Sequence, residues 1–385
     1  MKSKEIGFNT ICTHAGEIED KQFKGAISPI YLSTSYAFED VDIKRYPRYF
    51  NTPNQEALCK KIALLENAES SLIFGSGMAA ISTALFAFLN GGDHIVLQRT
   101  IYGGTANLVN EEFEKHNIKY SYVDSQEPEG FLDKIKDNTK VIYIETPSNP
   151  LLTITDIKAI ADLAKAKGII TMIDNTFASP VNQNPIDLGI DIVLHSATKY
   201  LGGHSDILAG VVISSEDKIN TVFQMAKNLG GNLSDYTVWL LERSLKTMGL
   251  RVKAQNENAQ VLAEYLYANN KVAKVYYPGL TSHPEHELAK AQMNGFGGML
   301  SFELIEGLNA DEFQKKLQLI KSSMSLAGVE STILSPSKTS HGLLTPEERA
   351  KQGIKDGLLR FSVGIEEPED LIADIEQALK AMSEN

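Results

Sequence analysis

Short apolar segments alternate with amphipathic ones through the middle of the chain. Several of these segments are rich in valine and isoleucine and almost continuously hydrophobic, which is typical of strands covered on both faces. The predicted strands are Ile95–Leu97, Tyr120–Val123, Val141–Ile144, Ile169–Ile173, Ile192–Leu194 and Gly210–Ile213. Helical patterns such as Ile157–Ala166 lie between them. The alternation predicts an α/β fold in which a mostly parallel sheet is flanked by helices.

The pattern changes towards both ends of the chain. Residues 1–50 contain few periodic segments, and we expect them to form an N-terminal arm that contacts a neighbouring subunit. A long helical pattern covers about 235–268, and we place a domain boundary inside it. The prediction is therefore a central domain at 51–245 and a smaller α+β C-terminal domain at 246–385. The last part should form an amphipathic helix from Pro368 to about Met382.

Composition and charge narrow the range of partners. The 385 residues carry a net charge of −12, which disfavours nucleic acid and anionic membranes as partners. The longest uncharged apolar run, near Met78–Leu89, is shorter than the ~20 residues of a membrane span. The N-terminus has no apolar signal segment. Cys12 and Cys59 lie far apart and show no metal-ligand spacing, so we expect no metal and a reducing, cytoplasmic location.

The most informative segment follows the predicted strand that ends near His195. Ser196 and Thr198 precede a single lysine, Lys199, and two glycines follow. Ligands of open α/β sheets bind beyond the carboxyl ends of strands. A lysine there can lose solvent, which lowers its pKa and makes its amine nucleophilic. A surface lysine in a loop would look similar, so this segment alone leaves both interpretations open.

Polar residues also follow other predicted strands. Asn149 and Asp174 stand just after two of them, where two strand ends can converge on one crevice. Asp174 followed by Asn175 is equally compatible with a helix cap. The run Ser76-Gly77-Met78 has the pattern of a strand-to-helix turn whose backbone N–H groups bind phosphate, although a packing turn would look the same.

Together these motifs resemble one family. The segment Ser196-Ala-Thr-Lys199-Tyr-Leu-Gly-Gly-His-Ser-Asp206 closely resembles the lysine signature of the Cys/Met-metabolism pyridoxal-phosphate enzymes. This family includes cystathionine γ-synthase, cystathionine β- and γ-lyase and methionine γ-lyase. At least six motifs occur in the family's order, from Thr34 to Glu366. The resemblance implies the fold-type I transferase fold, with pyridoxal 5′-phosphate (PLP) bound by the domain at 51–245.

The resemblance also implies a role for each motif around the cofactor. Lys199 would form an imine with PLP, and Tyr102 would stack on its ring as a second catalytic residue. Asp174 would pair with the pyridine nitrogen, and Asn149 would lie near the phenolate oxygen. The phosphate would be bound by Ser76, Gly77, Met78, Ser196 and Thr198, and by Tyr46 and Arg48 of a neighbouring subunit.

The substrate would be bound by further residues that match the family pattern. Arg360 would bind the α-carboxylate, with Ser325 and Asn149 beside the substrate. A homotetramer of two dimers, with active sites shared between subunits, is implied by resemblance alone.

Residues at two positions leave both the substrate and the type of reaction undecided. Asn107 stands where relatives that read a distal carboxylate often have arginine, and Leu334 stands where some γ-lyases have glutamate. We expect a carbon–sulfur lyase that acts on cystathionine or a related sulfur amino acid. The alternative is γ-replacement of an O-acyl-homoserine by cysteine. A silent relative with a binding role is less expected, because the lysine, aspartate, tyrosine and arginine of the site are all present.

Several histidines carry weaker signals. His283 and His286 resemble a metal pair only superficially, and a solvated helix start at Pro284 is the more common case. The other three, His195, His204 and His341, lie beside family motifs, and we expect a structural role for them.

Overall fold

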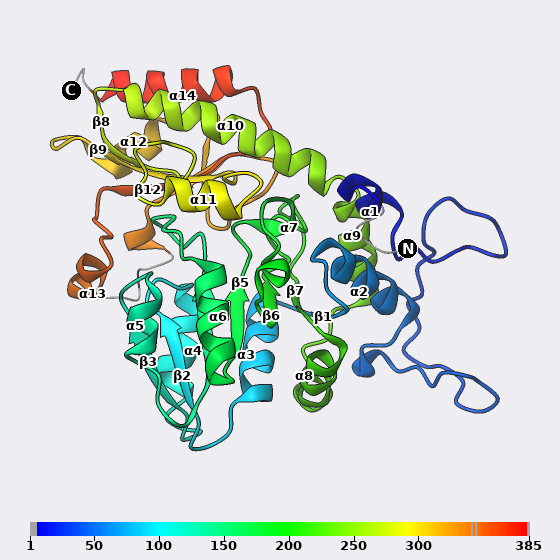
Figure 1. The fold of residues 1–385 in the computed structure, drawn as a ribbon. Helices are drawn as coiled ribbons and strands as arrows, with labels where there is room; N and C mark the ends of the chain where they lie inside the picture. Colours follow the sequence, from blue (N-terminus) through cyan, green and yellow to red (C-terminus); the bar gives the residue numbers. More distant parts are fainter. Residues whose placement is uncertain (1–5, 340–341, 343–344, 383–385) are drawn as a thin grey trace.

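A seven-stranded sheet forms the centre of the computed structural model, which describes residues 6–339, 342 and 345–382 (Figure 1). Its strands follow the order β1-β7-β6-β5-β4-β2-β3. Strands β2 to β6 pair in parallel, whereas β7 is antiparallel to both β1 and β6. Each strand predicted from the sequence has a counterpart here, and the α/β prediction is confirmed. The strands are β1 (Ser70–Phe74), β2 (His94–Gln98), β3 (Lys119–Val123), β4 (Thr139–Glu145), β5 (Ile170–Asp174), β6 (Ile192–His195) and β7 (Gly210–Ser214).

Helices cover both faces of this sheet, so alternate residues of each strand enter different cores. In β4, Ile142 and Ile144 pack with helices of one face, whereas Val141 and Tyr143 pack with helices of the other. The first face carries α2 (Pro53–Leu65), α6 (Ile157–Lys167) and α9 (Asp235–Leu245), and the second carries α3 (Gly77–Phe88), α4 (Gly103–Glu112) and α8 (Glu216–Leu229). Shorter helices α5 (Pro128–Leu132), α7 (Ser179–Asn182) and η3 (Pro185–Leu188) connect the strands.

The helix starts follow local chemistry. A capping box opens α2, since the Thr52 hydroxyl accepts from Gln55 N and the Gln55 side chain accepts from Thr52 N. Ser76 caps α3 by accepting from Ala79 N at 3.0 Å. These caps fix where α2 and α3 begin.

The prediction of one helix over 235–268 was wrong, because two helices occupy this segment: α9 and α10 (Met248–Ala268). The carbonyl of Ser244 explains the break. It accepts from Thr247 N at 3.3 Å and from the Arg251 guanidinium at 3.1 Å, so it is withdrawn from a regular helical ladder.

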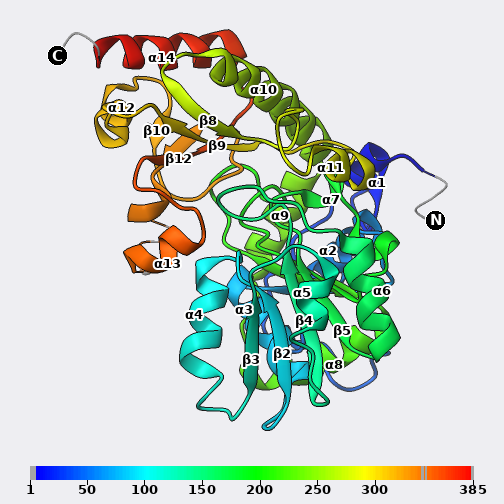
Figure 2. The same ribbon diagram turned by 60° about the vertical axis from the view of Figure 1, so that its left-hand side comes forward.

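A second sheet has its own core. Its strands follow the order β10-β11-β12-β9-β8, and α10 and α14 lie side by side over one face in Figures 1 and 2. The predicted C-terminal helix is confirmed as α14 (Pro368–Ala381). The other elements are β8 (Val272–Tyr276), α11 (His286–Gln292), β9 (Met299–Leu304), α12 (Ala310–Lys316), β10 (Lys321–Ser322), β11 (Thr332–Leu334), η4 (Pro336–Lys338), α13 (Pro346–Lys351) and β12 (Leu358–Ser362).

The predicted solvated helix start at Pro284 was wrong. Helix α11 begins two residues later, at His286, and His283 is buried. Burial lowers the pKa of His283 to about 4, so the imidazole is neutral near pH 7. Its ring Nδ1 accepts from Glu285 N at 3.3 Å, so His283 bonds within the loop rather than facing solvent.

The N-terminal segment contains α1 (Phe8–His14), a long irregular stretch and η2 (Pro47–Tyr49). Figure 1 shows this stretch as blue loops that extend away from the rest of the chain. Its large apolar side chains are unusually exposed, for example Phe23 at 80% and Phe38 at 69%. Such a surface is typical of a segment that packs on another chain.

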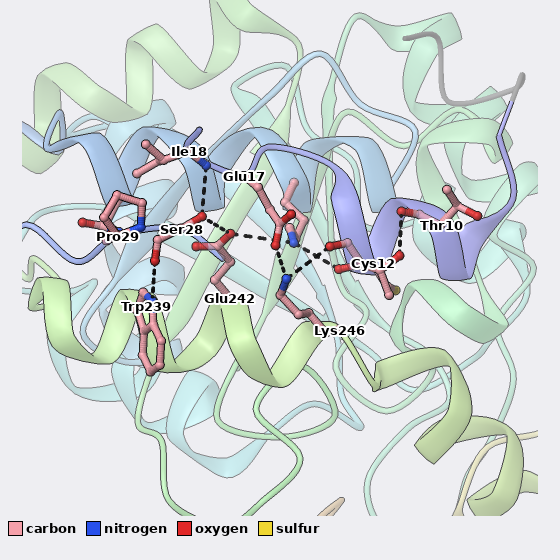
Figure 3. A network of polar contacts seen from close by, with 12 residues as sticks. Thr10, Cys12, Glu17, Ile18, Ser28, Pro29, Trp239, Glu242 and Lys246 are labelled. Carbon is pink, nitrogen blue, oxygen red and sulfur yellow. Dashed lines mark hydrogen bonds and ion pairs between the residues drawn. The ribbon is translucent and has the colours of Figure 1, made fainter. Parts of the chain in front are cut away.

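A buried polar network fixes the base of the arm (Figure 3). The Ser28 hydroxyl accepts from Ile18 N at 3.0 Å and donates to Glu242 at 2.8 Å, while Trp239 donates to Ser28 O at 2.9 Å. Lys246 forms an ion pair with Glu17. The start of the arm is therefore tied to α9. Across the described residues, no helix is long and apolar enough to span a membrane.

Candidate active site

A cavity of about 370 Å³ opens at the carboxyl ends of β4, β5 and β6, and residues of the second sheet form its other wall. A larger cavity of about 640 Å³ between α3 and α8 has no lysine, arginine or carboxylate among the described residues that line it. We therefore place the chemistry in the smaller one. It brings together most of the residues predicted from the sequence: Ser76, Gly77, Met78, Tyr102, Asn149, Asp174, Ser196, Thr198, Lys199, Ser325 and Arg360.

Lys199 lies just beyond β6 and is partly buried. Its Nζ donates to the Ser325 hydroxyl at 2.6 Å. Burial, together with the positive charge of Arg360, lowers the pKa of Lys199 to about 8. Roughly a tenth of its amine is therefore neutral and nucleophilic at pH 7, far more than for an ordinary lysine.

Two buried carboxyl groups end neighbouring strands. Asp174 on β5 and Glu145 on β4 are paired in register, and burial raises the pKa of both. Asp174 accepts from Thr176 N at 3.0 Å. Glu145 accepts from Tyr102 N at 2.6 Å and so fixes the start of α4. We predicted no role for Glu145 from the sequence, although its place at a strand end was a signal for one.

The start of α3 lies very close to the end of β6. A Cβ atom at Gly77 would lie 2.8 Å from Ser196 Cβ, so only glycine permits this approach. The backbone N–H groups at the start of α3 therefore stand beside the Ser196 hydroxyl, in an arrangement suited to phosphate. The Thr198 hydroxyl bonds within the chain, donating to Ala209 O at 3.2 Å and accepting from Ala209 N at 3.1 Å.

Arg360 enters the cavity from β12 and is buried. Its Nη1 donates to Asn149 Oδ1 at 3.0 Å and its Nη2 to Ser325 O at 3.1 Å. Within the described part of the chain, its Nε is buried without a hydrogen-bond partner. Burial lowers the pKa of Arg360 to about 10, against the opposing effect of Glu145. A guanidinium with an unsatisfied donor is well suited to bind a carboxylate.

The outer wall of the cavity is largely apolar. Leu208, Met324 and Leu334 line it, together with Thr339. Tyr102 stands at the rim and is 42% exposed. Asn107, which we expected to bear on specificity, is an exposed residue of α4 and is not one of the lining residues.

Tyr46 and Arg48 are not part of the cavity of their own chain. The Arg48 guanidinium donates to Lys227 O at 2.5 Å and lies 5.7 Å from the Tyr46 ring centroid. Both residues belong to the arm, so any phosphate contact from them would be made to another subunit.

The histidines near the family motifs have structural contacts. His195 is fully buried and its Nε2 lies 2.5 Å from Glu66 Oε1. His204 Nδ1 lies 2.8 Å from Gly202 O, and His341 falls outside the described residues. No cluster of three or more metal-ligating side chains occurs in the portion of the chain that the structure describes.

Comparison with known proteins identifies the family. The family model described as "Cys/Met metabolism PLP-dependent enzyme" matches residues 9–380. The chain belongs to this family. Cystathionine beta-lyase of Lactococcus lactis subsp. cremoris (strain MG1363) is 44% identical over 371 residues, which cover 95% of this chain and 97% of the relative. Cystathionine gamma-lyase of Bacillus subtilis (strain 168) is 43% identical, with 96% and 98% covered.

A solved structure agrees with this family assignment. Cystathionine gamma-lyase from Lactobacillus plantarum, complexed with L-serine, superposes with a TM-score of 0.95 at 40% identity, and 98% of this chain and all of that chain are covered. The resemblance predicted from the motifs is confirmed, and so is the dependence of the family on PLP. The cavity fits this cofactor, since it combines a lysine of lowered pKa, a buried carboxylate and a glycine-lined helix start.

Proposed function

We propose that the protein is a PLP-dependent carbon–sulfur lyase that acts on cystathionine or a related sulfur amino acid. The observation that carries the proposal is that Lys199 and Arg360 line one cavity and both contact Ser325, Lys199 at its hydroxyl and Arg360 at its carbonyl oxygen. Lys199 provides a nucleophilic amine, and the Arg360 guanidinium can bind a carboxylate. An amino-acid substrate offers a carboxylate and a Cα proton for these two groups. Bound PLP supplies the electron sink that stabilises negative charge at the substrate Cα.

Different residues of this chain would then bind the substrate, transfer the proton at its Cα and hold the cofactor. Arg360 and Asn149 bind the α-carboxylate, which fixes the direction of the Cα–H bond. Lys199 would take and return the proton at Cα. With PLP bound, Asp174 would hold its ring nitrogen in the protonated form, and Tyr102 would lie against its ring.

The phosphate would lie between the start of α3 and the Ser196 and Thr198 side chains. Tyr46 and Arg48 would complete this site from a neighbouring subunit, which accounts for the exposed apolar arm. The dimer would then be the smallest active unit, and we propose a homotetramer of two dimers. Free cysteines Cys12 and Cys59 are compatible with the cytoplasmic location that we propose.

The apolar outer wall disfavours γ-replacement of an O-succinyl ester, because Leu208, Met324 and Leu334 offer no charge to its distal carboxylate. Cystathionine also has a distal carboxylate and an O-acetyl ester has none, so this wall does not separate elimination from γ-replacement. The choice of a lyase therefore rests on the two relatives described above, which are named as lyases.

A substrate panel tests the proposal. Purified PLP-loaded protein is incubated with cystathionine, methionine, homocysteine or cysteine, and separately with O-acetyl- or O-succinyl-homoserine plus cysteine. Lyase activity yields ammonia with pyruvate or 2-oxobutyrate, whereas γ-replacement yields new cystathionine without ammonia. Lys199→Ala serves as the control and should give none of these products. Cystathionine formation that greatly exceeds 2-oxo acid formation would overturn the lyase assignment.

A further inference from the structure

A buried carboxylate lies behind the cavity and has no place in the function proposed above. Glu66 stands directly after α2 and is fully buried. Three side chains converge on it: His195 Nε2 at 2.5 Å, Asn175 Nδ2 at 3.1 Å and Asn184 Nδ2 at 3.4 Å. Burying a carboxylate is costly unless it accepts several hydrogen bonds, so this arrangement calls for an explanation.

Two of these three partners adjoin residues of the cavity. Asn175 follows Asp174 at the end of β5, and His195 precedes Ser196 at the end of β6. Successive residues of an extended strand point to opposite faces. Asp174 and Ser196 therefore line the cavity while Asn175 and His195 point behind it, where both bind the same carboxylate.

Further bonds connect the same two strand ends. Asn175 N donates to Leu194 O at 2.9 Å, and Ser196 N donates to the Thr176 hydroxyl at 2.8 Å. The hydrogen bonding between the two strands thus continues past the ends of β5 and β6. One of these bonds is accepted by a side chain, the Thr176 hydroxyl, instead of by a backbone carbonyl. Glu66 joins these strand ends to α2, a helix of the adjacent layer.

We propose that Glu66 is a positioning residue that fixes the distance between Asp174 and Ser196, and so fits the site to the ring nitrogen and the phosphate of one cofactor. The inference rests on the proposed roles of Asp174 and Ser196. A rigid cofactor spans both contacts, so a small displacement of one strand end weakens one contact or the other.

Electrostatics support the same arrangement. Burial raises the pKa of Asp174, whereas hydrogen bonds from Thr176 and the electrostatic effect of the nearby His195 lower it. The imidazole is itself held by Glu66 at 2.5 Å. Glu66 thereby orients a group that favours the ionised form of Asp174, which is the form that pairs with a protonated ring nitrogen.

The alternative is that Glu66 only stabilises the fold. A variant of another buried carboxylate, one that lies away from the cavity, separates the two possibilities. Asp374 on α14 is also a buried carboxylate, and it accepts four hydrogen bonds: three from the backbone N–H groups of Gln318, Leu319 and Ile320 and one from the Gln377 side chain. It belongs to the core of the second sheet, away from the cavity. Asp374→Asn should therefore lower stability without a specific effect on the cofactor.

The experiment compares Glu66→Leu, Glu66→Gln and Asp374→Asn with wild type. Three quantities are measured: the unfolding midpoint of the apoprotein, its dissociation constant for PLP, and the visible circular dichroism per bound PLP. We expect all three variants to have lower midpoints. Glu66→Leu should bind PLP roughly tenfold more weakly, the size of one lost charge-assisted hydrogen bond, and with altered dichroism. Glu66→Gln, which keeps an acceptor oxygen, should recover part of the affinity.

The outcomes are distinguishable. If wild type itself does not bind PLP, the proposed function fails. If wild type binds PLP and the Glu66 variants lose only stability, as Asp374→Asn does, the positioning role is overturned. If Glu66→Leu does not fold, the affinity and dichroism of Glu66→Gln decide alone, and wild-type values for both would overturn the role.

Discussion

The Lys199 amine lies 2.6 Å from the Ser325 hydroxyl, although the two residues are 126 positions apart and come from different parts of the fold. Ser325 has a φ of +79°, a backbone conformation that is unfavourable for a serine. The Arg360 guanidinium donates to its carbonyl oxygen at 3.1 Å and stabilises this conformation. The second sheet and its loops therefore set the direction of the Lys199 amine beyond the end of β6.

Removing the Ser325 hydroxyl should affect turnover more than cofactor binding. In Ser325→Ala the amine loses its partner and samples more orientations, so we expect kcat to fall about tenfold. The dissociation constant for PLP should change less than about twofold, because the residues proposed to hold the cofactor's ring and phosphate are unchanged. Steady-state kinetics and PLP titration provide both values. Ser323→Ala, at an exposed serine two residues away, is the matched control. A wild-type kcat in Ser325→Ala would contradict the role.

The rate at which PLP attaches to the apoprotein should depend on pH through Lys199. Its pKa is lowered to about 8, and only the neutral amine reacts, so the rate should rise with pH and level off above 8. Below that value the rise should approach about tenfold per pH unit. Stopped-flow absorbance measures the rate.

Arg360→Gln tests the cause of this pH dependence. It removes a positive charge that lowers the pKa of Lys199, so the midpoint should move to higher pH. Ionisations of free PLP are common to both proteins and cancel in the comparison. An identical midpoint in the variant would show that Arg360 does not influence the amine.

Sharing of the active site between subunits can be tested by complementation. We expect Arg48→Ala and Lys199→Ala each to be strongly impaired alone. If Arg48 acts in the neighbouring subunit, a mixed dimer has one intact site. Random mixing should then restore about a quarter of wild-type activity, since half of the dimers are mixed and half of their sites are intact. Subunits are exchanged by mild denaturation and refolding, with each variant refolded alone as the control. No gain on mixing would contradict the shared site.

The network at the base of the arm should contribute strongly to stability. Lys61 Nζ is buried, donates to Cys12 O at 3.0 Å and lies 3.9 Å from Glu242. Lys61→Met leaves the Glu242 carboxylate with less compensation, which should reduce the free energy of unfolding by about 3–5 kcal/mol. Lys61→Met combined with Glu242→Leu should lose less than the single variant.

Urea denaturation of the apoprotein measures the free energy of unfolding of the Lys61→Met variant and of the double variant. The exposed pair Lys158–Asp162 supplies a control, because Lys158→Met removes a solvated ion pair and should barely change the midpoint. A double variant less stable than Lys61→Met would show that the buried pair does not account for the loss.

Local sequence patterns predicted the main sheet and most of the cavity. Strand ends such as Asp174 and Lys199 were found because parallel strands bring their carboxyl ends to one edge. Arg360 and Ser325 came from family resemblance, since nothing in their own neighbourhoods indicates that β12 and the loop before β11 meet the first sheet.

Other features were not predictable from local patterns. The break between α9 and α10 involves Arg251 reaching the Ser244 carbonyl, and Gly249 beside it was too weak a local signal to predict an interruption. Glu66 looked like an ordinary polar residue at a helix end, because its partners lie 109 to 129 positions further along the chain. Contacts of this kind arise from the tertiary fold, so a single sequence carries little signal for them.

The cavity is built where two separately packed cores meet, one behind Lys199 and the other behind Arg360. Substitutions that repack the smaller core can therefore move Arg360 and Ser325 together, while the strand ends that carry Asp174 and Lys199 keep their own packing. Because the two cores pack separately, new substrate preferences can arise by gradual change in the smaller core alone. It also predicts that specificity-altering mutations selected in the laboratory will concentrate in the loops around β11 and β12.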